Sequence, residues 1–291
     1  MKVLNYGSLN YDYVYEVEHI NRPGETQSCK SRNVFCGGKG LNQSIALAKA
    51  GVPVYQGGAI GEDGELLLEV CRENHIDTTY LNQIQGPSGH AMIQLDQNAE
   101  NCIIIYGGAN QSQTKERIDQ TLEGFGDGDF LLLQNEVNCL DYLIDRAYEK
   151  GMTTILNPSP WDDKLEACDL KKVKIFLINE IEGGQITGKE NPEEILDEME
   201  KKFPDAQVVL TLGGKGACYQ GSGNRIYQEA IPANVVDTTA AGDTFTGYFI
   251  AGMTEGLEIK ENMRRAAKAA SIAVSRMGAS DSIPEISELR G

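Results

Sequence analysis

The sequence predicts an α/β protein with a mostly parallel central sheet and helices on both faces. Several short strands are continuously apolar and bounded by polar residues, namely FLLLQ (130–134), TTILN (153–157), IFLIN (175–179) and VVLTLG (208–213). Strands of this kind suit a parallel sheet that is covered on both sides. Helical patterns fill the gaps between the runs, and 291 residues are enough for one large core.

The same alternation predicts the remaining elements in order. We expect strands at 2–7 and 54–61, and helices from about Gly40 to Ala50 and over 64–74. Two further helices are expected over 139–151 and 191–203. The second opens with Asn191 as its N-cap and Pro192 at its first helical position.

Two segments depart from this pattern because they alternate between apolar and polar residues. One is YDYVYEVEHI (11–20) with QSCKSRNVF (27–35), and the other is HAMIQLDQNAENCIIIY (90–106), a hairpin that turns near 97–99. We therefore predict one α/β domain over residues 1–291, with a small β-sheet lid whose strands are inserted at about 11–35 and 90–106.

Composition excludes several classes of function. The formal net charge is −17, which argues against a nucleic-acid partner because phosphate backbones are bound by basic faces. The seven cysteines form no CxxC pair and read as buried free thiols of a reducing compartment. We see neither a signal peptide nor an apolar run long enough to cross a membrane, so we expect a cytoplasmic protein without a membrane partner.

The stretch DTTAAGDTFTGYFIAGM (237–253) carries the clearest chemical signal. Ala240, Ala241 and Gly242 are small enough to leave their amides open at the start of an apolar helix. Such a nest stabilises charge on a transferring phosphoryl group, and Asp243 beside it could accept a proton from an attacking hydroxyl. Alternatively, Asp243 only caps the helix, which would leave Asp237 unexplained.

Three other segments could approach a ligand. CGGKGLNQS (36–44) is a glycine-rich loop that opens a helix, but a tight packing turn explains it equally well. TLGGKG (211–216) could lie under a nucleotide or form an ordinary hairpin. Asn179 and Glu182 follow a buried strand, where ligands bind in open α/β folds; Glu182 could hold Mg²⁺ through water or simply favour a helix N-terminus.

Taken in order, these motifs resemble the ribokinase family of sugar kinases, the PfkB-type carbohydrate kinases. The resemblance runs along the whole chain, through GSLNYD (7–12), PGET (23–26), GGKGLNQS (37–44), GGAN (107–110), NPSP (157–160), NEIE (179–182), TLGGKG (211–216), DTTAAGDTF (237–245) and AVSRMGASDSIP (273–284). It implies a ribokinase-like fold and phosphoryl transfer from ATP to a sugar hydroxyl, with Mg²⁺ and K⁺ as cofactors.

The resemblance also implies roles by position. The sugar site would be lined by Asn10, Asp12, Gly38, Lys39, Gly40, Asn42, Glu136 and Asp243. ATP would be contacted by Asn179, Thr211, Gly213, Gly214, Gly216, Gly242 and Lys268. The anion hole would comprise Ala240, Ala241 and Gly242, with Asp243 as the catalytic base. The K⁺ site would be formed by Asp237, Thr239, Ala273, Arg276, Gly278 and Ser282, and Glu182 would reach Mg²⁺ through water.

The match favours D-ribose, converted at its primary hydroxyl to D-ribose 5-phosphate. The alternatives are a fructokinase-like or nucleoside kinase of the same family and, from other classes, a catalytically silent sugar-binding regulator or a dehydrogenase. Two departures bear on this choice: Tyr11 replaces a small residue beside Asp12, and Lys268 stands where relatives place Asn or His beside the adenine. Tyr11 could reshape the acceptor pocket, stack on a nucleobase or merely pack in the lid.

The lid predicts a homodimer. Its alternating strands would expose apolar side chains, namely Val14, Val17, Ile20, Met92 and Ile103. An open flap with such a face is a solubility liability unless two lids pair across a twofold axis.

Overall fold

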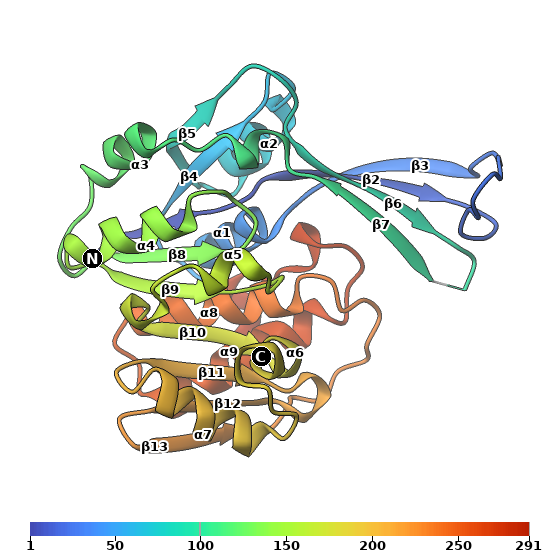
Figure 1. Cartoon of the computed structure of the whole chain (residues 1–291). Helices are drawn as coiled ribbons and strands as arrows, with labels where there is room; N and C mark the ends of the chain where they lie inside the picture. The colour runs from blue at the N-terminus through green and yellow to red at the C-terminus, as the bar shows by residue number, and fades with distance from the viewer. Residues whose placement is uncertain (99, 291) are drawn as a thin grey trace.

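A computed structural model describes residues 1–98 and 100–290, and its largest feature is a long, mostly parallel sheet (Figure 1). In this part of the chain the sheet has nine strands in the order β13-β12-β11-β10-β9-β8-β1-β4-β5. The strands are β1 (Val3–Tyr6), β4 (Val54–Ile60), β5 (Asp77–Gln83), β8 (Phe130–Gln134), β9 (Thr153–Asn157), β10 (Ile175–Asn179), β11 (Gln207–Thr211), β12 (Ala217–Gly221) and β13 (Asn224–Gln228). Only β12 and β13 run antiparallel to their neighbours.

Helices cover both faces of this sheet, as the apolar runs predict. One face carries α1 (Lys39–Lys49), α2 (Glu65–Glu73), α8 (Ala241–Thr254) and α9 (Ile259–Ala273). The other carries α3 (Lys115–Leu122), α4 (Leu140–Glu149), α5 (Asp163–Glu166), α6 (Glu180–Thr187) and α7 (Pro192–Lys202). Along β8, Leu132 packs into the first core whereas Leu131 and Leu133 pack into the second. The strand is therefore buried on both faces, which confirms the predicted fold class.

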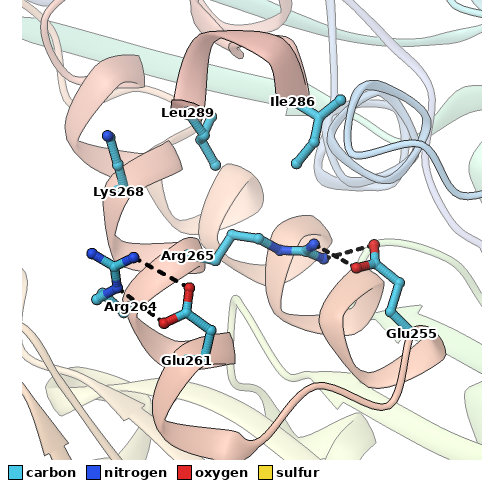
Figure 2. A pocket seen from close by; sticks show the side chains of 7 residues that line it. All are labelled: Glu255, Glu261, Arg264, Arg265, Lys268, Ile286 and Leu289. Carbon is cyan, nitrogen blue, oxygen red and sulfur yellow. Dashed lines mark hydrogen bonds and ion pairs between the residues drawn. The ribbon is translucent and has the colours of Figure 1, made fainter. Parts of the chain in front are cut away.

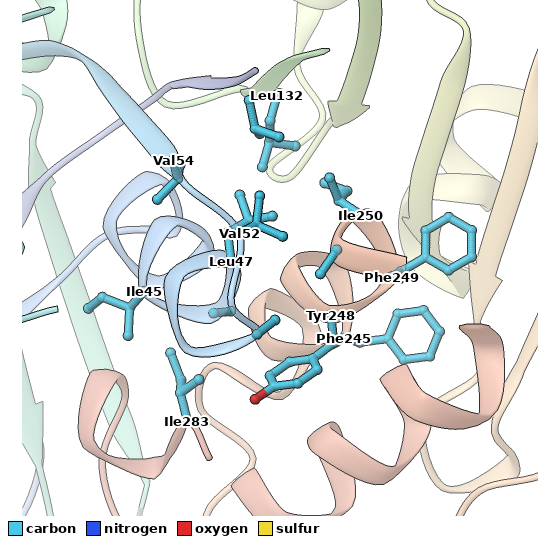
Figure 3. Close-up of a cluster of buried hydrophobic side chains, with 14 of the residues drawn as sticks. Ile45, Leu47, Val52, Val54, Leu132, Phe245, Tyr248, Phe249, Ile250 and Ile283 are labelled. Carbon is cyan, nitrogen blue, oxygen red and sulfur yellow. The ribbon is translucent and has the colours of Figure 1, made fainter. Parts of the chain in front are cut away.

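Part of the first core is built by α1 and α8 (Figure 3). It contains Ile45 and Leu47 of α1 and Phe245, Tyr248 and Phe249 of α8, and all five side chains are buried. The Tyr248 hydroxyl donates a hydrogen bond to the Pro284 carbonyl, which ties the C-terminal segment to this core. Both helices begin at the same end of the large sheet, so this packing fixes how their N-termini face each other.

A separate four-stranded sheet, hereafter the small sheet, projects from one end of the large sheet (Figure 1). Its strands, in the order β3-β2-β6-β7, are β2 (Asn10–Glu16), β3 (Ser31–Gly37), β6 (Gly89–Leu95) and β7 (Asn101–Tyr106). The predicted hairpin is present, with β6 and β7 antiparallel, although Ala99 of its predicted turn lies outside the described residues.

The structure corrects two expectations about side chains of this region. Val17 is buried, 5% exposed, rather than displayed on an open face. All seven cysteines are free, as expected, but Cys29 and Cys102 are exposed rather than buried. Within the described residues, none of the helices combines the length and the apolar character needed to cross a bilayer.

Candidate active site

Polar side chains gather where four parallel strands of the large sheet end. Gln134, Asn157, Asn179 and Thr211 are the last residues of β8, β9, β10 and β11. The register pairs Gln134 with Asn157, and Asn179 with Thr211. The N-terminus of α8 delivers Asp243 to this edge, since Gln43 bridges Asp243 and Asn157 through its side-chain amide. Ligands of open α/β folds bind at such an edge.

Asp243 lies in the first turn of α8, and α1 supplies both of its hydrogen-bond donors. Asn42 Nδ2 lies 3.0 Å from Asp243 Oδ2, and Gln43 Nε2 lies 2.9 Å from Oδ1. The N-cap position belongs to Ala240, and no side chain caps this helix. Asp243 is therefore not the helix cap that the sequence left open as an alternative. Burial raises the pKa of Asp243 to about 6, while hydrogen bonds from Gln43 and Asn42 favour its charged form.

The backbone before Asp243 is strained at one residue and open at another. Ala240 adopts a left-handed conformation with φ 58°, which is unfavourable for a residue with a Cβ. An added Cβ on Gly242 would meet nothing within 4 Å, and no positive φ requires glycine there. Glycine weakens a helix, so neither packing nor conformation explains Gly242. An open backbone amide at a helix N-terminus is suited to a phosphate or another anion.

The glycine-rich segment before α1 is fitted against the end of β1 and the start of β2. Gly38 has φ +90°, and a Cβ on Gly40 would come within 2.4 Å of the Ser8 backbone nitrogen. A Cβ on Gly37 would come within 2.3 Å of Asp12 Oδ2, so this glycine leaves room for the carboxylate. Packing thus accounts for glycine at these positions, and it also brings the N-terminus of α1 beside Asp12.

Lys39, Glu136 and Ser8 form a partly buried hydrogen-bonded cluster near Asp12. Lys39 Nζ lies 2.7 Å from Glu136 Oε1, and the Lys39 backbone nitrogen donates to Oε2 at 3.1 Å. The Ser8 hydroxyl donates to the same Oε2. Burial, with a smaller contribution from the Glu136 carboxylate, raises the pKa of Asp12 to about 6, and the Lys39 ammonium acts in the opposite sense.

Asn10 is held in place by Asn110, which lies far away in the sequence. Asn110 Nδ2 donates to Asn10 Oδ1 at 2.7 Å, and its own oxygen accepts from the Leu9 backbone nitrogen at 3.1 Å. The residues predicted to bind the sugar lie on four pieces of chain: the start of β2, the N-terminus of α1, the segment after β8 and the N-terminus of α8.

Asn179 and Glu182 form a capping box at the start of α6. Asn179 Oδ1 accepts from the backbone nitrogens of Ile181 and Glu182, and Glu182 Oε2 accepts from the Asn179 nitrogen at 2.8 Å. Glu182 Oε1 accepts from Asn179 Nδ2 at 3.0 Å. Glu182 is thus the helix N-terminal acid that the sequence allowed, and a role toward Mg²⁺ stays a prediction.

The 211–216 segment is the turn of an antiparallel hairpin between β11 and β12. Gly213 and Gly216 have positive φ, +54° and +109°, and a Cβ on Gly216 would clash with the Gln228 carbonyl. Gly214 differs because its φ is ordinary and an added Cβ would meet nothing within 4 Å. Conformation explains two of these glycines, while Gly214 leaves an uncovered backbone in the turn that follows Thr211.

Asp237 organises the loop that precedes α8. Its Oδ1 accepts from the Thr239 nitrogen at 2.9 Å and hydroxyl at 2.6 Å, and its Oδ2 accepts from the Gly278 nitrogen at 3.0 Å. Burial alone would raise the pKa of Asp237, but these hydrogen bonds lower it. Arg276 turns its guanidinium to Glu288, so it could offer a cation only its backbone carbonyl.

Lys268 lies on α9 in a hollow of its own (Figure 2). This hollow is about 360 Å³ and is lined by Glu255, Glu261, Arg264, Arg265, Lys268, Ile286 and Leu289. None of the other residues predicted to bind ATP lines it. The placement of Lys268 beside the adenine therefore stays a prediction that this cavity does not support.

Tyr11 points away from the Asp12 carboxylate, because successive residues of a strand face opposite sides. Its ring is 5% exposed in the first core, and its hydroxyl donates to the Asp63 carbonyl at 2.7 Å. Of the readings left open, packing is the one that fits this position.

Comparison with known proteins shows the family of this chain. Residues 1–286 match the family described as pfkB family carbohydrate kinase. The chain belongs to the pfkB family of carbohydrate kinases. A ribokinase of Arabidopsis thaliana is 37% identical over 96% of this chain and 77% of its own length, and one of Haemophilus influenzae is 33% identical over 96% and 94%.

Solved structures of the same kind share the fold. A ribokinase of Thermotoga maritima superposes with a TM-score of 0.87 at 31% identity, covering 99% of this chain and 98% of its own. A ribokinase of Arabidopsis thaliana complexed with ribose and ATP superposes with a TM-score of 0.86 at 32% identity, covering 99% and 97%.

Three residues that bond predicted site residues are not themselves among the predictions, although each stands in one of the motifs above. Gln43 belongs to GGKGLNQS, Ser8 to GSLNYD and Asn110 to GGAN. Their roles depend on contacts with Asp243, Glu136 and Asn10 that only the folded chain creates. The motifs gave the only signal that these positions matter.

Proposed function

We propose that this protein transfers the γ-phosphoryl group of ATP to the primary hydroxyl of a pentose, converting D-ribose to D-ribose 5-phosphate. One observation carries the proposal: Asp243 is held by Asn42 and Gln43 at the start of α8, beside the open backbone of Gly242. A proton acceptor and an anion-binding helix N-terminus thus lie next to each other, as phosphoryl transfer requires.

The sugar is proposed to sit between Asp12 and Asp243. Asp12, Asn10 and the Lys39–Glu136 pair offer charged and amide groups to its secondary hydroxyls, and Asp243 accepts the proton of the primary hydroxyl as the O–P bond forms. The bond from the transferred phosphorus to the ADP oxygen breaks in the same step, and the Ala241 and Gly242 amides stabilise the charge on the phosphoryl oxygens. The names of the relatives, including a ribokinase complexed with ribose and ATP, support this acceptor.

ATP is proposed to lie across the ends of β10 and β11, over Asn179, Thr211 and the uncovered Gly214. Mg²⁺ would be held mainly by the nucleotide phosphates and by water, and Glu182 would reach it through water. Mg²⁺ commonly keeps several waters and few protein ligands, and the described residues hold no cluster of three His, Cys, Asp or Glu side chains arranged for a metal. The ion would neutralise charge on the phosphates.

A K⁺ ion is proposed beside Asp237. Oxygen donors suit a hard cation, and two segments would supply them: the loop before α8, with the Asp237 carboxylate and a carbonyl near Thr239, and the end of α9 with the segment after it, with carbonyls near Ala273, Arg276, Gly278 and Ser282. Ser282 is fully buried and Gly278 is bonded to Asp237, so the two halves of this donor set are held together. Since the loop leads directly into Ala240, a cation there would help to order the anion hole.

The chain is further proposed to act as one kinase domain over residues 1–291. The small sheet would serve as a lid over the sugar, and two lids would pair in a homodimer. We also propose a cytoplasmic location without nucleic-acid or membrane partners, in keeping with the net charge of −17.

An assay of ADP release across pentoses, hexoses and nucleosides tests the proposal. We expect ribose to exceed fructose and adenosine in kcat/KM by well over about tenfold, since each unpaired buried polar group costs about 1–3 kcal/mol. A preference for fructose or a nucleoside would support kinase activity but reject ribose as the acceptor. No ADP release with any acceptor would favour the silent regulator.

Tyr11→Ala provides a matched check of the acceptor pocket. Because the Tyr11 ring packs in the core, we expect lower stability with the sugar preference unchanged.

A further inference from the structure

A chain of hydrogen-bonded polar side chains runs through the first core and ends on Asp243. It links β4, α1, β1, β8 and α8 through Gln56, Ser44, Asn5, Gln134, Gln43 and Asp243. The first five of these side chains are fully buried, each with 0% exposure. Buried polar groups are costly unless they are satisfied, so a chain of this length in a core calls for a physical reason.

Backbone carbonyls fix the orientation of the Gln56 amide, at the end of this chain of side chains farthest from Asp243. Gln56 Nε2 donates to the carbonyls of Gly7 and Gly57, at 3.2 and 2.8 Å, and a carbonyl can only accept. The Gln56 amide therefore has one orientation, in which its oxygen accepts from the Ser44 hydroxyl at 2.7 Å.

A second carbonyl fixes the next amide. Asn5 Nδ2 donates to the Gly40 carbonyl at 2.6 Å and to Ser44 Oγ at 2.8 Å, so Asn5 Oδ1 is an acceptor. Gln134 Nε2 donates to that oxygen at 2.9 Å and to Gln43 Oε1 at 2.6 Å. With its oxygen engaged in this way, Gln43 must turn its NH₂ group toward Asp243.

We propose that Gln43 is a positioning residue for the base Asp243, and that Gln134 fixes the orientation in which Gln43 acts. Gln43 and Asn42 each donate one N–H to a different oxygen of Asp243, which prevents the carboxylate from rotating and favours its ionised form. Each oxygen keeps a free lone pair for the proton of the acceptor hydroxyl. This inference rests on the proposed function only in taking Asp243 as the base.

Two charged groups also face Asp243 and must stay constant in any test. The Lys39 ammonium lowers the pKa of Asp243, and the Glu136 carboxylate raises it. Variants at Gln43 and Gln134 leave both groups in place, so a change in the titration of Asp243 reports on the amide chain.

The test compares Gln43→Met and Gln134→Met, which keep the side-chain length but donate no hydrogen bond. We expect both to lower kcat with ribose about tenfold or more, and to move the acidic limb of the kcat profile upward by about one pH unit. KM for ribose and for ATP should stay within about threefold, because neither side chain is proposed to touch a substrate. Gln134→Met is the sharper variant, since Gln134 contacts neither Asp243 nor a proposed ligand site.

Gln220→Met is the matched control. Gln220 of β12 is also a buried glutamine, but its Nε2 donates to the Leu196 carbonyl of α7, away from the hydrogen-bonded chain that ends on Asp243. It should lose stability without moving the pH profile.

A second readout does not need activity. The carboxyl ¹³C resonance of Asp243, assigned by its loss in Asp243→Asn, should titrate at higher pH in both Met variants than in the wild type. An unchanged Asp243 titration in either folded variant would overturn the inference. If the wild type phosphorylates no sugar, the proposed function fails, while the ¹³C titration still decides whether the chain controls Asp243.

Discussion

Gly247 of α8 lies directly against Ala46 of α1. A Cβ placed on Gly247 would come within 2.4 Å of the Ala46 Cβ, so the two helices approach as closely as their backbones allow. Asp243 stands one turn before Gly247, and Asn42 stands one turn before Ala46. The helix crossing therefore sets the distance at which Asn42 and Gln43 meet the Asp243 carboxylate.

The first prediction follows from this crossing. Gly247→Ala should separate α1 and α8, lower stability by about 1–3 kcal/mol through overpacking, and lower kcat about tenfold or more by displacing Asp243. Urea unfolding and steady-state kinetics measure the two effects. Gly126→Ala is the control, because an added Cβ there would meet nothing within 4 Å. A Gly247→Ala protein with wild-type kcat would show that the crossing does not set the geometry of the site.

The second prediction concerns Asp243 itself. Asp243→Asn keeps the shape of the side chain but cannot accept the proton, so kcat should fall by about 10²–10⁴-fold. Affinities for ribose and ATP, measured by calorimetry, should change little. A variant that keeps most of its turnover would remove Asp243 from the role of base.

The third prediction is a loss of activity in acid. Burial raises the pKa of both Asp243 and Asp12 to about 6, and a base must be ionised to accept a proton. Turnover should therefore be full above this value and decline as the pH falls through about 6. The pH profiles of kcat and kcat/KM, recorded at constant ionic strength, measure the effect. The acidic limb of the pH profile should remain in Asp12→Asn, because Asp243 is unchanged. If the acidic limb disappears in that variant, the titrating group is Asp12.

Local patterns predicted much of the fold and of the site. The runs 130–134 and 175–179 became β8 and β10 without a shift, because full burial makes every position apolar. Asn191 and Pro192 begin α7 as predicted, since capping is a local interaction. By contrast, β5 (Asp77–Gln83) is a polar edge strand, and the apolar positions of α9 (Ile259–Ala273) are mostly alanines interrupted by charged residues, so neither produced a long apolar run.

The contacts that complete the site could not be read from the sequence. Gln43 and Asp243 are separated by 200 residues, and only the packing of α1 on α8 brings them together. Because side chains alternate along a strand, the sequence already places Tyr11 on the face opposite to that of Asp12. It does not predict the hydrogen bond from the Tyr11 hydroxyl to the Asp63 carbonyl. Long-range geometry of this kind depends on the whole core, and one sequence does not encode it in any local pattern.

The fourth prediction concerns the monovalent cation. Turnover should be higher in K⁺ than in Na⁺ or a bulky organic cation at equal ionic strength and constant Mg²⁺. Asp237→Ala should abolish this difference, since it removes the carboxylate that binds Thr239 and Gly278. Asp205→Ala, a change at a distant acid, should preserve it. Equal rates in all three salts with the wild type would reject the cation site.

The last prediction is a homodimer formed through the small sheet. The pairings of β2, β3, β6 and β7 place Phe35, Ile103 and Ile105 on the same face as Asp12, and these apolar side chains are 46%, 49% and 66% exposed. An exposed apolar face of this kind is a liability unless it is covered, and pairing with a second copy would cover this one face on each protomer. Light scattering at micromolar concentration should give the mass of a dimer. Ile105→Lys should give a monomer, whereas Ile104→Lys, a change on the opposite face at 64% exposure, should leave the dimer intact. A monomeric wild type would reject the dimer, and a dimer lost only in Ile104→Lys would assign it to the other face of the sheet.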